Sequence, residues 1–395
     1  MNGQTLMTGE SPANPLESLI CEIIAENGPI SLERYMTLAL AHPAHGYYRS
    51  QAPFGAAGDF ITAPEISQMF GELIGVWCVE VWRAMGAPVP FRLVELGPGR
   101  GVLMADLLRA AKVSSAFRAA LDRDLIEVDL VETSEILRET QRRTLQGCGA
   151  PLAWRARADD VPEGAAIFIA NEFFDCLPVR HFVRGADGWR ERLVGLDHGG
   201  KLCFGLAPEP EQGFDPAGET GDVIEICSPA VRLMESLAAR ISGRGGALLA
   251  FDYGYDYGDA RRGETLQALR RHNFADPLRD PGKSDLTAHV DFGGLARAAR
   301  ESGAFAFGPL AQGEWLMRMG IAERAGALRS RAKPEQAASI DSALERLTGA
   351  GLRSVGETHM AKLFKVLAVT PAGFAPPPGF EGLRQGMKNE DEALI

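Results

Sequence analysis

The sequence contains the run Phe91-Arg92-Leu93-Val94-Glu95-Leu96-Gly97-Pro98-Gly99-Arg100-Gly101, followed by Val102-Leu103-Met104-Ala105-Asp106-Leu107-Leu108. The run predicts an apolar strand with an acid near its end, then three alternate glycines, then the start of a helix. Glycine permits positive φ angles and lets a ligand approach the backbone closely. A helix start adds free N–H groups and a partial positive charge. Together these features predict a nucleotide-binding turn at the carboxyl end of a parallel strand.

The residues around the glycines discriminate between nucleotides. A dinucleotide-binding turn follows the pattern G-x-G-x-x-G/A, and counting from Gly97 puts Val102 at the third small position. No Gly-Lys-Ser/Thr follows the glycines, which excludes a phosphate-cradling P-loop. The carboxylate of Glu95 is instead suited to bind an amino or other cationic group of a ligand. S-adenosylmethionine carries an ammonium, a sulfonium and ribose hydroxyls but no phosphate, so it is the expected cofactor. The competing interpretation is a plain surface turn.

A second acid supports this choice. The segment 125–131 alternates like a strand and ends at Glu132, whose carboxylate is suited to both ribose hydroxyls. After the third strand, Asp159 or Asp160 is a candidate for the adenine amino group. The expected cofactor-binding residues are Glu95, Gly97, Pro98, Gly99, Gly101, Glu132, Asp59 and Asp160.

Composition sets the class of protein. The chain has 395 residues with 46% hydrophobic and 24% charged residues, which is ordinary for a soluble globular protein of two or three domains. A net charge of −11 disfavours nucleic acid as a partner and weakly favours a cationic substrate. The six cysteines are scattered singly, and we expect no metal site. The first basic residue is Arg34, so we expect a cytoplasmic protein, or a mitochondrial-matrix one if the source is eukaryotic, with no membrane insertion.

Periodicity predicts the order of elements along the chain. Helices are expected at 16–25, 31–40 and 66–85, and mostly helical structure is expected at 291–348. A loop-rich region is expected at 253–290. Strands are expected at 91–96, 125–131, 152–155, 165–170, 180–183, 189–196, 201–206, 246–251 and 362–369.

Several blocks together resemble one family. They are His42-Pro43 with Gly46-Tyr47-Tyr48, Gly58-Asp59-Phe60-Ile61-Thr62-Ala63-Pro64-Glu65-Ile66-Ser67 with Phe70-Gly71-Glu72, the glycine run, Asn171-Glu172-Phe173-Phe174-Asp175-Cys176-Leu177-Pro178-Val179, Asp252-Tyr253-Gly254-Tyr255, Asp276-Pro277, and Asp285-Leu286-Thr287-Ala288-His289-Val290-Asp291-Phe292. The chain resembles the MidA/NDUFAF7-like (DUF185) methyltransferases. The blocks from Asn171 and from Asp285 are the most specific, and the resemblance spans about residues 35–370.

The resemblance implies an α/β fold of the class I methyltransferase, Rossmann-like type. It implies a seven-stranded, mostly parallel sheet with a late antiparallel strand, a helical N-terminal extension, and β and helical insertions. The expected parts are a helical region with a covering loop at 1–90, a methyltransferase core at 91–370 with insertions at about 179–226 and 255–350, and a disordered tail at 371–395. The resemblance also implies S-adenosylmethionine as cofactor and a protein arginine as acceptor, in a subunit of respiratory complex I. The absence of a presequence pattern is typical of a bacterial member.

An arginine acceptor makes a chemical demand. The guanidinium is always charged and is best held by carboxylates. The strand ending at Ala170 would deliver Asn171 and Glu172 to the sheet edge, with Asp175 a turn later. The remaining candidates on the acceptor side are Glu65 on the covering loop, Asp252 and His289. Structural roles compete: Glu172 as a helix-start acid, Asp175 as a cap and His289 as a buried structural histidine.

Three other functions stay open. The first is methylation of a small molecule or of another oxygen or nitrogen acceptor. The second is an assembly chaperone that binds the cofactor without transferring its methyl group. The third is a dehydrogenase, which Val102 disfavours. The sequence leaves the oligomeric state and the number of methyl groups open.

Overall fold

The computed structural model describes residues 14–50, 62–214, 216–256, 263–270, 273–352, 356 and 359–383. By its internal contacts the chain divides into two compact units. Unit 1 comprises Met1–Pro53, Pro178–Ile226 and Arg262–Thr287. Unit 2 comprises Phe54–Leu177, Cys227–Arg261 and Ala288–Ile395. The sequence-based boundaries at residues 90 and 370 stay a prediction of how the chain divides.

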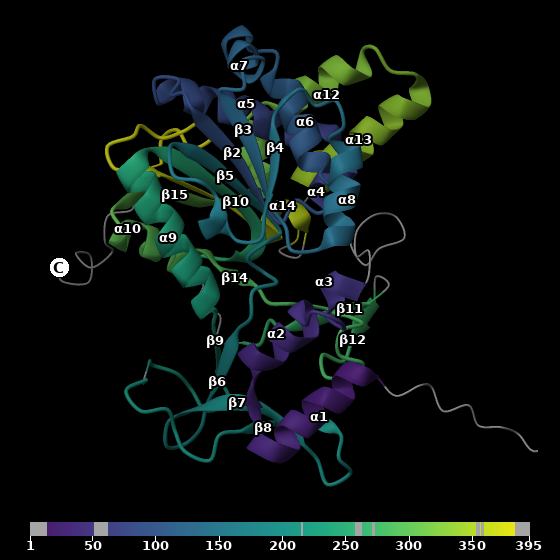
Figure 1. Cartoon of the computed structure of the whole chain (residues 1–395), viewed down its shortest axis with the longest axis vertical. Coiled ribbons are helices and arrows are strands. Elements are labelled where there is room, and N and C mark those ends of the chain that lie inside the picture. The colour runs from purple at the N-terminus through teal and green to yellow at the C-terminus, as the bar shows by residue number, and fades with distance from the viewer. Residues whose placement is uncertain are drawn as a thin grey trace, which may run out of the picture. The chain divides into compact units, whose positions relative to one another are not determined.

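Unit 2 is built on a sheet of eight strands (Figure 1). The strands are β2 (Phe91–Leu96), β3 (Ile126–Val131), β4 (Leu152–Arg155), β5 (Ala166–Asn171), β10 (Gly246–Tyr255), β14 (Val290–Asp291), β15 (Ala304–Ala311) and β16 (Phe364–Pro371). Their order is β15-β16-β10-β5-β2-β3-β4, and β14 pairs with the end of β10. Five neighbouring strands run parallel, namely β4, β3, β2, β5 and β10. Strand β16 runs antiparallel to both β10 and β15. The expected mostly parallel sheet with a late antiparallel strand is confirmed.

Two of these strands were not expected. The short β14 is the eighth strand, beyond the seven that the resemblance implies. Strand β15 lies in a region expected to be mostly helical, so that expectation is wrong for residues 304–311. The strand is specified by tertiary pairing, because β16 bonds to it along most of its length. Its Ala-Phe-Ala-Phe start carries only a weak strand signal, since alanine has low β-propensity.

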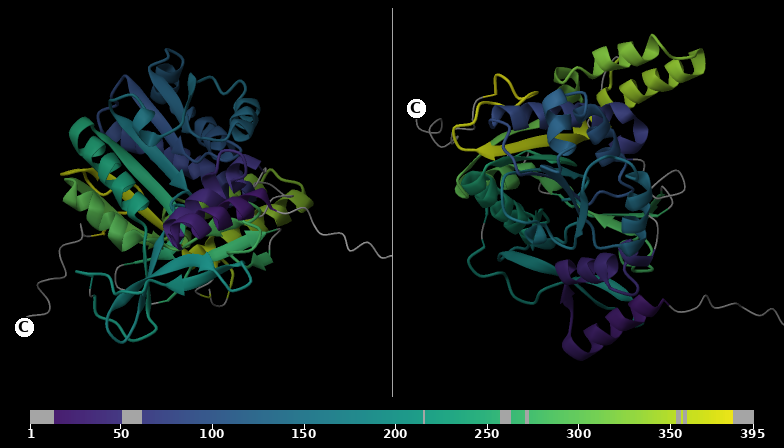
Figure 2. Two further views of the ribbon diagram at one scale, coloured as in Figure 1. Left: turned by 60° about the horizontal axis from the view of Figure 1, so that its bottom comes forward. Right: turned by 45° about the horizontal axis from the view of Figure 1, so that its top comes forward.

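Helices cover both faces of this sheet (Figure 2). Successive side chains of a strand point to opposite faces, so Leu93 and Ile167 pack in one hydrophobic cluster while Val94 and Phe168 pack in another. The first cluster lies under α5, α6 and α11 to α13, and the second under α9 and α10. The helices of unit 2 are α4 (Ala63–Ile66), α5 (Gln68–Ala84), α6 (Val102–Ala111), α7 (Ser115–Leu121), α8 (Glu135–Thr144), α9 (Ser228–Arg244), α10 (Phe292–Glu301), α11 (Gln312–Arg318), α12 (Ile321–Arg329), α13 (Pro334–Thr348) and α14 (Met360–Leu363), with a 3₁₀ turn at Ala158–Asp160.

Close packing of α5 on α6 fixes the helix that follows the glycine run. A Cβ atom at Gly75 would lie 2.4 Å from the carbonyl oxygen of Leu107, and one at Gly71 would lie 2.7 Å from Cβ of Asp106. Only glycine allows this approach. From α5, Glu72 also accepts from Arg109 on α6 at 3.0 Å. Helix α6 is therefore packed tightly against α5.

The chain after β16 is partly ordered. Residues 371–383 form turns, and the side chain of Phe380 is fully buried in the cluster that contains Trp315. Residues 371–383 of the expected tail are therefore ordered, because Phe380 gains apolar burial, and residues 384–395 lie outside the described part of the chain.

Unit 1 contains two antiparallel sheets. Its elements are α1 (Pro15–Asn27), β1 (Ile30–Ser31), α2 (Leu32–Ala41), α3 (Tyr47–Ser50), β6 (Arg180–Arg184), β7 (Trp189–Leu196), β8 (Leu202–Leu206), β9 (Val223–Ile226), β11 (Gln267–Arg270), β12 (Asn273–Ala275) and β13 (Asp285–Thr287). One sheet has the order β1-β7-β6-β9 with β8 beside β7, and the other has the order β12-β11-β13. The strands expected near 180, 189 and 201 are confirmed as β6, β7 and β8. Over the ranges that the structure describes, no helix combines the length and apolar character needed to cross a bilayer.

Candidate functional site

The glycine turn connects β2 to α6 in unit 2. Gly97, Gly99 and Gly101 have φ angles of 63°, 51° and 80°, all in the left-handed region. A Cβ atom at Gly97 would lie only 2.9 Å from the ring of Phe173. The turn is closed by the Gly101 N–H, which donates to the carbonyl of Pro98 at 2.7 Å. These conformations explain the alternate glycines, since other residues rarely adopt them.

A cavity opens beside this turn, entirely within unit 2. It is lined by Thr62, Pro64, Glu65, Glu95, Gly97, Pro98, Gly99, Arg100, Val102, Leu103, Asn171 and Glu172. In its wall, Glu95 is only 3% exposed, and its Oε2 atom has no hydrogen-bond partner. Burial raises the pKa of Glu95 to about 8. A buried acceptor without a donor is costly, so this atom is suited to a donor or cation supplied by a ligand.

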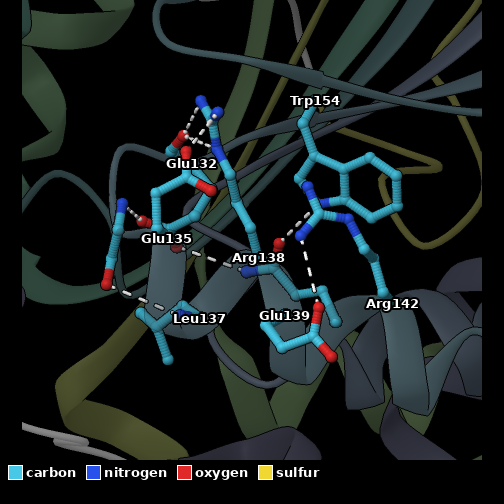
Figure 3. Close-up of polar contacts among 9 residues, drawn as sticks. Glu132, Glu135, Leu137, Arg138, Glu139, Arg142 and Trp154 are labelled. Atoms are coloured by element: carbon cyan, nitrogen blue, oxygen red, sulfur yellow. Dashed lines mark hydrogen bonds and ion pairs between the residues drawn. The ribbon is translucent and has the colours of Figure 1, made fainter.

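Glu132 follows β3, as expected, and is buried. Figure 3 shows Glu132 with the side chains around it. Its Oε1 accepts from the Ser134 N–H at 2.7 Å, and its Oε2 accepts from Nε2 of Gln141 at 3.3 Å. Burial raises the pKa of Glu132, while these hydrogen bonds lower it. The same Gln141 nitrogen donates to the carbonyl of Gly99 at 2.8 Å. One side chain therefore connects the glycine turn to the acid after β3.

The remaining cofactor candidates are less informative. Asp160 is exposed, and its carboxylate accepts from the Arg157 N–H at 2.9 Å, which caps the 3₁₀ turn. Asp159 is also exposed and accepts from Ser236. An adenine contact by either acid stays a prediction. Asp59 lies outside the residues that the structure describes.

The end of β5 carries Asn171 and Glu172 into the cavity wall. Glu172 has a φ of 50°, which is uncommon for a residue with a side chain and is found at strained functional positions. Its carboxylate accepts from Asn171 at 3.2 Å and from the Ala63 N–H. Burial and the neighbouring Asp175 raise the pKa of Glu172 to about 8. On Asn171, the buried Oδ1 atom has no partner.

Asp252, in the C-terminal half of β10, holds the turn that follows β5. One of its carboxylate oxygens accepts from the backbone N–H groups of Phe173, Phe174 and Asp175 at 3.1, 2.9 and 3.2 Å. The side chain has no exposed surface. Burial with two neighbouring acids raises the pKa of Asp252, against the lowering effect of these hydrogen bonds. This arrangement favours a positioning role over the substrate contact expected from the sequence.

Asp175 and His289 both contact Tyr253. The Tyr253 hydroxyl donates to Asp175, and its ring meets the His289 ring edge-on at 5.4 Å. Burial raises the pKa of Asp175 to about 6. Glu172, Asp175 and Asp252 thus form one acid cluster, and no described Lys or Arg forms an ion pair with any of the three.

Glu65 lines the same cavity as Glu172, but it has a partner. Arg100 of the glycine turn donates to both of its carboxylate oxygens, at 3.3 and 3.2 Å. The Arg100 side chain is 42% exposed, so the pair is reachable by solvent. The expected pairing of Glu65 and Glu172 around one cation stays a prediction, since both line the same cavity and Glu65 already binds the Arg100 guanidinium.

Sequence reasoning missed Gln141, Trp154 and the Ala63 N–H. Gln141 sits in a charged amphipathic helix in which only it and Leu137 are buried. A polar residue on the apolar face of a helix is the signal that could have identified it. In the part of the chain that the structure describes, no three or more His, Cys, Asp or Glu side chains are arranged to hold one metal ion, and this includes the acid cluster.

Comparison with known proteins identifies the family. The profile of a family described as "Putative S-adenosyl-L-methionine-dependent methyltransferase" matches residues 73–310. The chain belongs to this family. The resemblance drawn from the sequence blocks is confirmed, and the protein is an S-adenosylmethionine-dependent methyltransferase. The unpaired oxygen of Glu95 and the glycine turn fit this cofactor, since it offers an ammonium group and needs close backbone approach.

Relatives cover most of the chain. It is 40% identical to protein arginine methyltransferase NDUFAF7, mitochondrial, of Danio rerio, over 82% of this chain and 81% of the relative. It is also 40% identical to the Homo sapiens protein of the same name, over 81% and 77% of the two chains. A Burkholderia thailandensis crystal structure with bound S-adenosyl-homocysteine is 30% identical, covers 93% of this chain and 95% of its own, and has a TM-score of 0.76.

Proposed function

We propose that this protein methylates an arginine side chain of another protein. The observation that carries the proposal is the acid cluster of Glu172, Asp175 and Asp252, which faces the cofactor cavity through Glu172 and lacks an ion-pairing Lys or Arg among the described residues. Several buried carboxyls without a cation are costly, unless they hold protons or bind a cationic ligand. A guanidinium is the cationic side chain whose charge is always present. The relatives named as protein arginine methyltransferases support the same acceptor.

In this proposal the cofactor lies along the ends of β2 and β3. Glu95 binds its ammonium group, the turn of Gly97, Pro98, Gly99 and Gly101 accommodates its backbone, and Glu132 binds the ribose hydroxyls. Asp160 or Asp59 would contact the adenine end. When bound, S-adenosylmethionine supplies an electrophilic methyl group. The protein's own work is to align the acceptor and to exclude water.

The acceptor guanidinium would lie against Glu172, with Glu65 on the opposite wall once Arg100 has moved away. Asn171 Oδ1 offers an additional acceptor for an N–H of the guanidinium. When a guanidinium nitrogen forms its bond to the methyl carbon, the carbon–sulfur bond breaks and one proton must leave that nitrogen. Glu172 is suited to take this proton, because it lines the cavity and a bound acceptor cation favours its ionised, proton-accepting form. Asp252 and Tyr253 hold the turn on which Glu172 and Asp175 lie.

The acceptor protein follows from the family resemblance. We propose a subunit of respiratory complex I, which would make this protein an assembly factor. Its compartment would be the cytoplasm of a bacterium, or the mitochondrial matrix in a eukaryote, where several relatives are named as mitochondrial.

The test is mass spectrometry of arginine methylation in source cells with and without the gene. The proposal predicts at least one methylarginine site that disappears with the gene and returns with the wild-type copy. It is overturned if every methylarginine is retained while another methylated product, on oxygen or a small molecule, is lost. That second outcome supports the small-molecule alternative.

A further inference from the structure

Gln141 occupies a position that the assigned roles leave unexplained. It lies in the middle of α8 with a fully buried side chain. Its amide bonds to three groups that are far apart in the sequence: the Gly99 carbonyl at 2.8 Å, Glu132 Oε2 at 3.3 Å and Trp154 Nε1 at 2.9 Å. Burying an amide is unfavourable unless its hydrogen bonds are satisfied, and here each polar atom has a partner.

The partners determine which way the amide faces. The indole N–H of Trp154 can only donate, so the atom it contacts must be the amide oxygen. The amide nitrogen then faces two acceptors, the Gly99 carbonyl and Glu132. Trp154 is itself covered by Arg142, whose guanidinium carbon lies 4.9 Å from the ring centroid (Figure 3). A flipped amide would place oxygen against two acceptors, which is repulsive.

We propose that Gln141 is a positioning residue for the cofactor. Its amide nitrogen donates to both the Gly99 carbonyl and Glu132. These two bonds hold the glycine turn, which would contact the methionine part of the cofactor, at a fixed distance from Glu132, which would contact the ribose. Trp154 sets the orientation of that amide. The inference rests on the proposed cofactor contacts of Glu132 and of the glycine turn. Gln141 itself touches no reacting atom.

A purely structural role is the alternative. A Cβ atom at Gly101 would lie 3.5 Å from Gln141, so this side chain also fills space beneath the turn. A space-filling role needs only volume, which Leu supplies about as well as Gln. A positioning role needs the two N–H donors. The two roles therefore predict different behaviour toward ligands that have or lack the ribose hydroxyls.

The experiment is calorimetric binding of S-adenosylhomocysteine and of its 2′,3′-dideoxyribose analogue to the full-length protein. In Gln141→Leu we expect affinity for S-adenosylhomocysteine to fall roughly tenfold, as for loss of hydrogen bonds to a charged group, and affinity for the dideoxy analogue to fall less than about threefold. Trp154→Phe, which keeps the ring and loses the donor, should show a smaller loss with the same preference. Arg143→Gln is the matched control on the same helix, since its side chain is 76% exposed and pairs with Glu139, and it should leave both affinities unchanged.

The outcomes distinguish a positioning role of Gln141 from a purely structural one. Equal losses for both ligands, or no loss at all, in Gln141→Leu overturn the inference, provided Glu132→Ala weakens S-adenosylhomocysteine binding by about ten- to a hundredfold. If Glu132→Ala binds like the wild type, the ribose assignment itself fails and the proposed cofactor contacts must be redrawn. If Gln141→Leu does not fold, the shorter amide of Gln141→Asn and the Trp154→Phe variant carry the test. In that case, a lack of preference between the two ligands in both variants overturns the inference.

Discussion

The ends of β3 and β5 both present acids at the same edge of the sheet, but the surroundings of the two carboxyls differ. At β3, both oxygens of Glu132 accept from N–H groups of Ser134 and Gln141. At β5, Glu172 has a left-handed backbone, lies beside Asp175, and has a pKa raised to about 8. Its neighbour Asn171 has a buried oxygen with no partner.

The difference indicates two kinds of binding site. Donors that are already in place hold the β3 acid in one orientation, as suits a cofactor that binds the same way in each cycle. The β5 acids lack compensating charge, which suits a cationic acceptor that supplies it on arrival. The strained backbone of Glu172 persists only if surrounding contacts maintain it. Asp252 supplies three such contacts, because it accepts from the three backbone N–H groups that follow Glu172.

The largest effect is expected at the glycine turn. Gly99→Val should abolish binding of S-adenosylhomocysteine, because Gly99 has a φ of 51° and a branched side chain there is strained and fills the space of the ligand. Calorimetry measures this, with Gly205→Val as the control, since nothing lies within 4 Å of a Cβ atom at Gly205. Undiminished binding in Gly99→Val would remove the turn from the cofactor site.

A smaller but specific effect is expected at Glu172. Glu172→Gln keeps size and hydrogen bonding and loses charge, so cofactor binding should persist while methyl transfer falls at least ~10²-fold, about 2.7 kcal/mol of barrier. The readout is incorporation of labelled methyl groups into protein from cells that lack the gene. Transfer at the wild-type rate would contradict the acid-cluster account. If complex assembly in cells is restored by a variant that cannot transfer, the chaperone alternative is favoured.

The pH dependence of cofactor binding tests the role of Glu95, which has an oxygen without a hydrogen-bond partner, in contrast to Glu132, both of whose oxygens accept hydrogen bonds. Glu95 holds its proton up to a pH of about 8 in the free protein, and an ammonium favours its ionised form. Binding should therefore release a proton, and affinity should rise with pH between 6 and 8, by at most about tenfold per pH unit. Glu95→Gln should remove this slope.

The same shift affects folding of the free protein. Since the folded pKa of Glu95 is raised above its unfolded value, its contribution to stability is present at pH 4 and is lost as pH rises toward 8. Urea unfolding at several pH values should show a flatter profile for Glu95→Gln than for the wild type. Identical profiles would mean that Glu95 already has a partner in solution.

The smallest effect concerns strain. Glu172→Gly should raise the free energy of unfolding by about 1 kcal/mol, because glycine adopts a φ of 50° without cost. Activity should be lost in the same variant. Glu163→Gly, at an exposed position without a positive φ, is the control and should not gain stability. A destabilised Glu172→Gly would show that the contacts of the carboxylate outweigh the backbone strain.

Much of the cofactor side was predictable because its signals are local. The glycines, Glu95 and Glu132 stand directly at the ends of β2 and β3, where a sequence pattern marks the strand and its turn. Gln141 was not predictable in the same way. Its role depends on Gly99 and Trp154, which lie 42 and 13 residues away and approach it only after the sheet has formed.

On the acceptor side, the sequence predicted which residues lie near the site, but it did not predict the contacts between their side chains. Strand periodicity placed Glu172 after β5 and Asp252 after a strand ending at residue 251. In the structure β10 continues to Tyr255, and Asp252 is fully buried within it. Likewise, Glu65 was expected in the cavity, and its ion pair with Arg100 was not. Side-chain partners across a sheet edge are set by tertiary contacts, which periodicity does not encode.

The most direct test of the claim that the acid cluster binds a cationic acceptor is the pKa of Glu172 itself. Carbon NMR of protein labelled at the glutamate carboxyls, with Glu172→Gln to assign its signal, measures that pKa in the ligand-free protein. We predict a value near 8 that moves clearly downward when methylguanidinium is added and stays in place with its neutral analogue methylurea. A Glu172 that titrates in the ordinary glutamate range, or one that ignores methylguanidinium, would contradict the account.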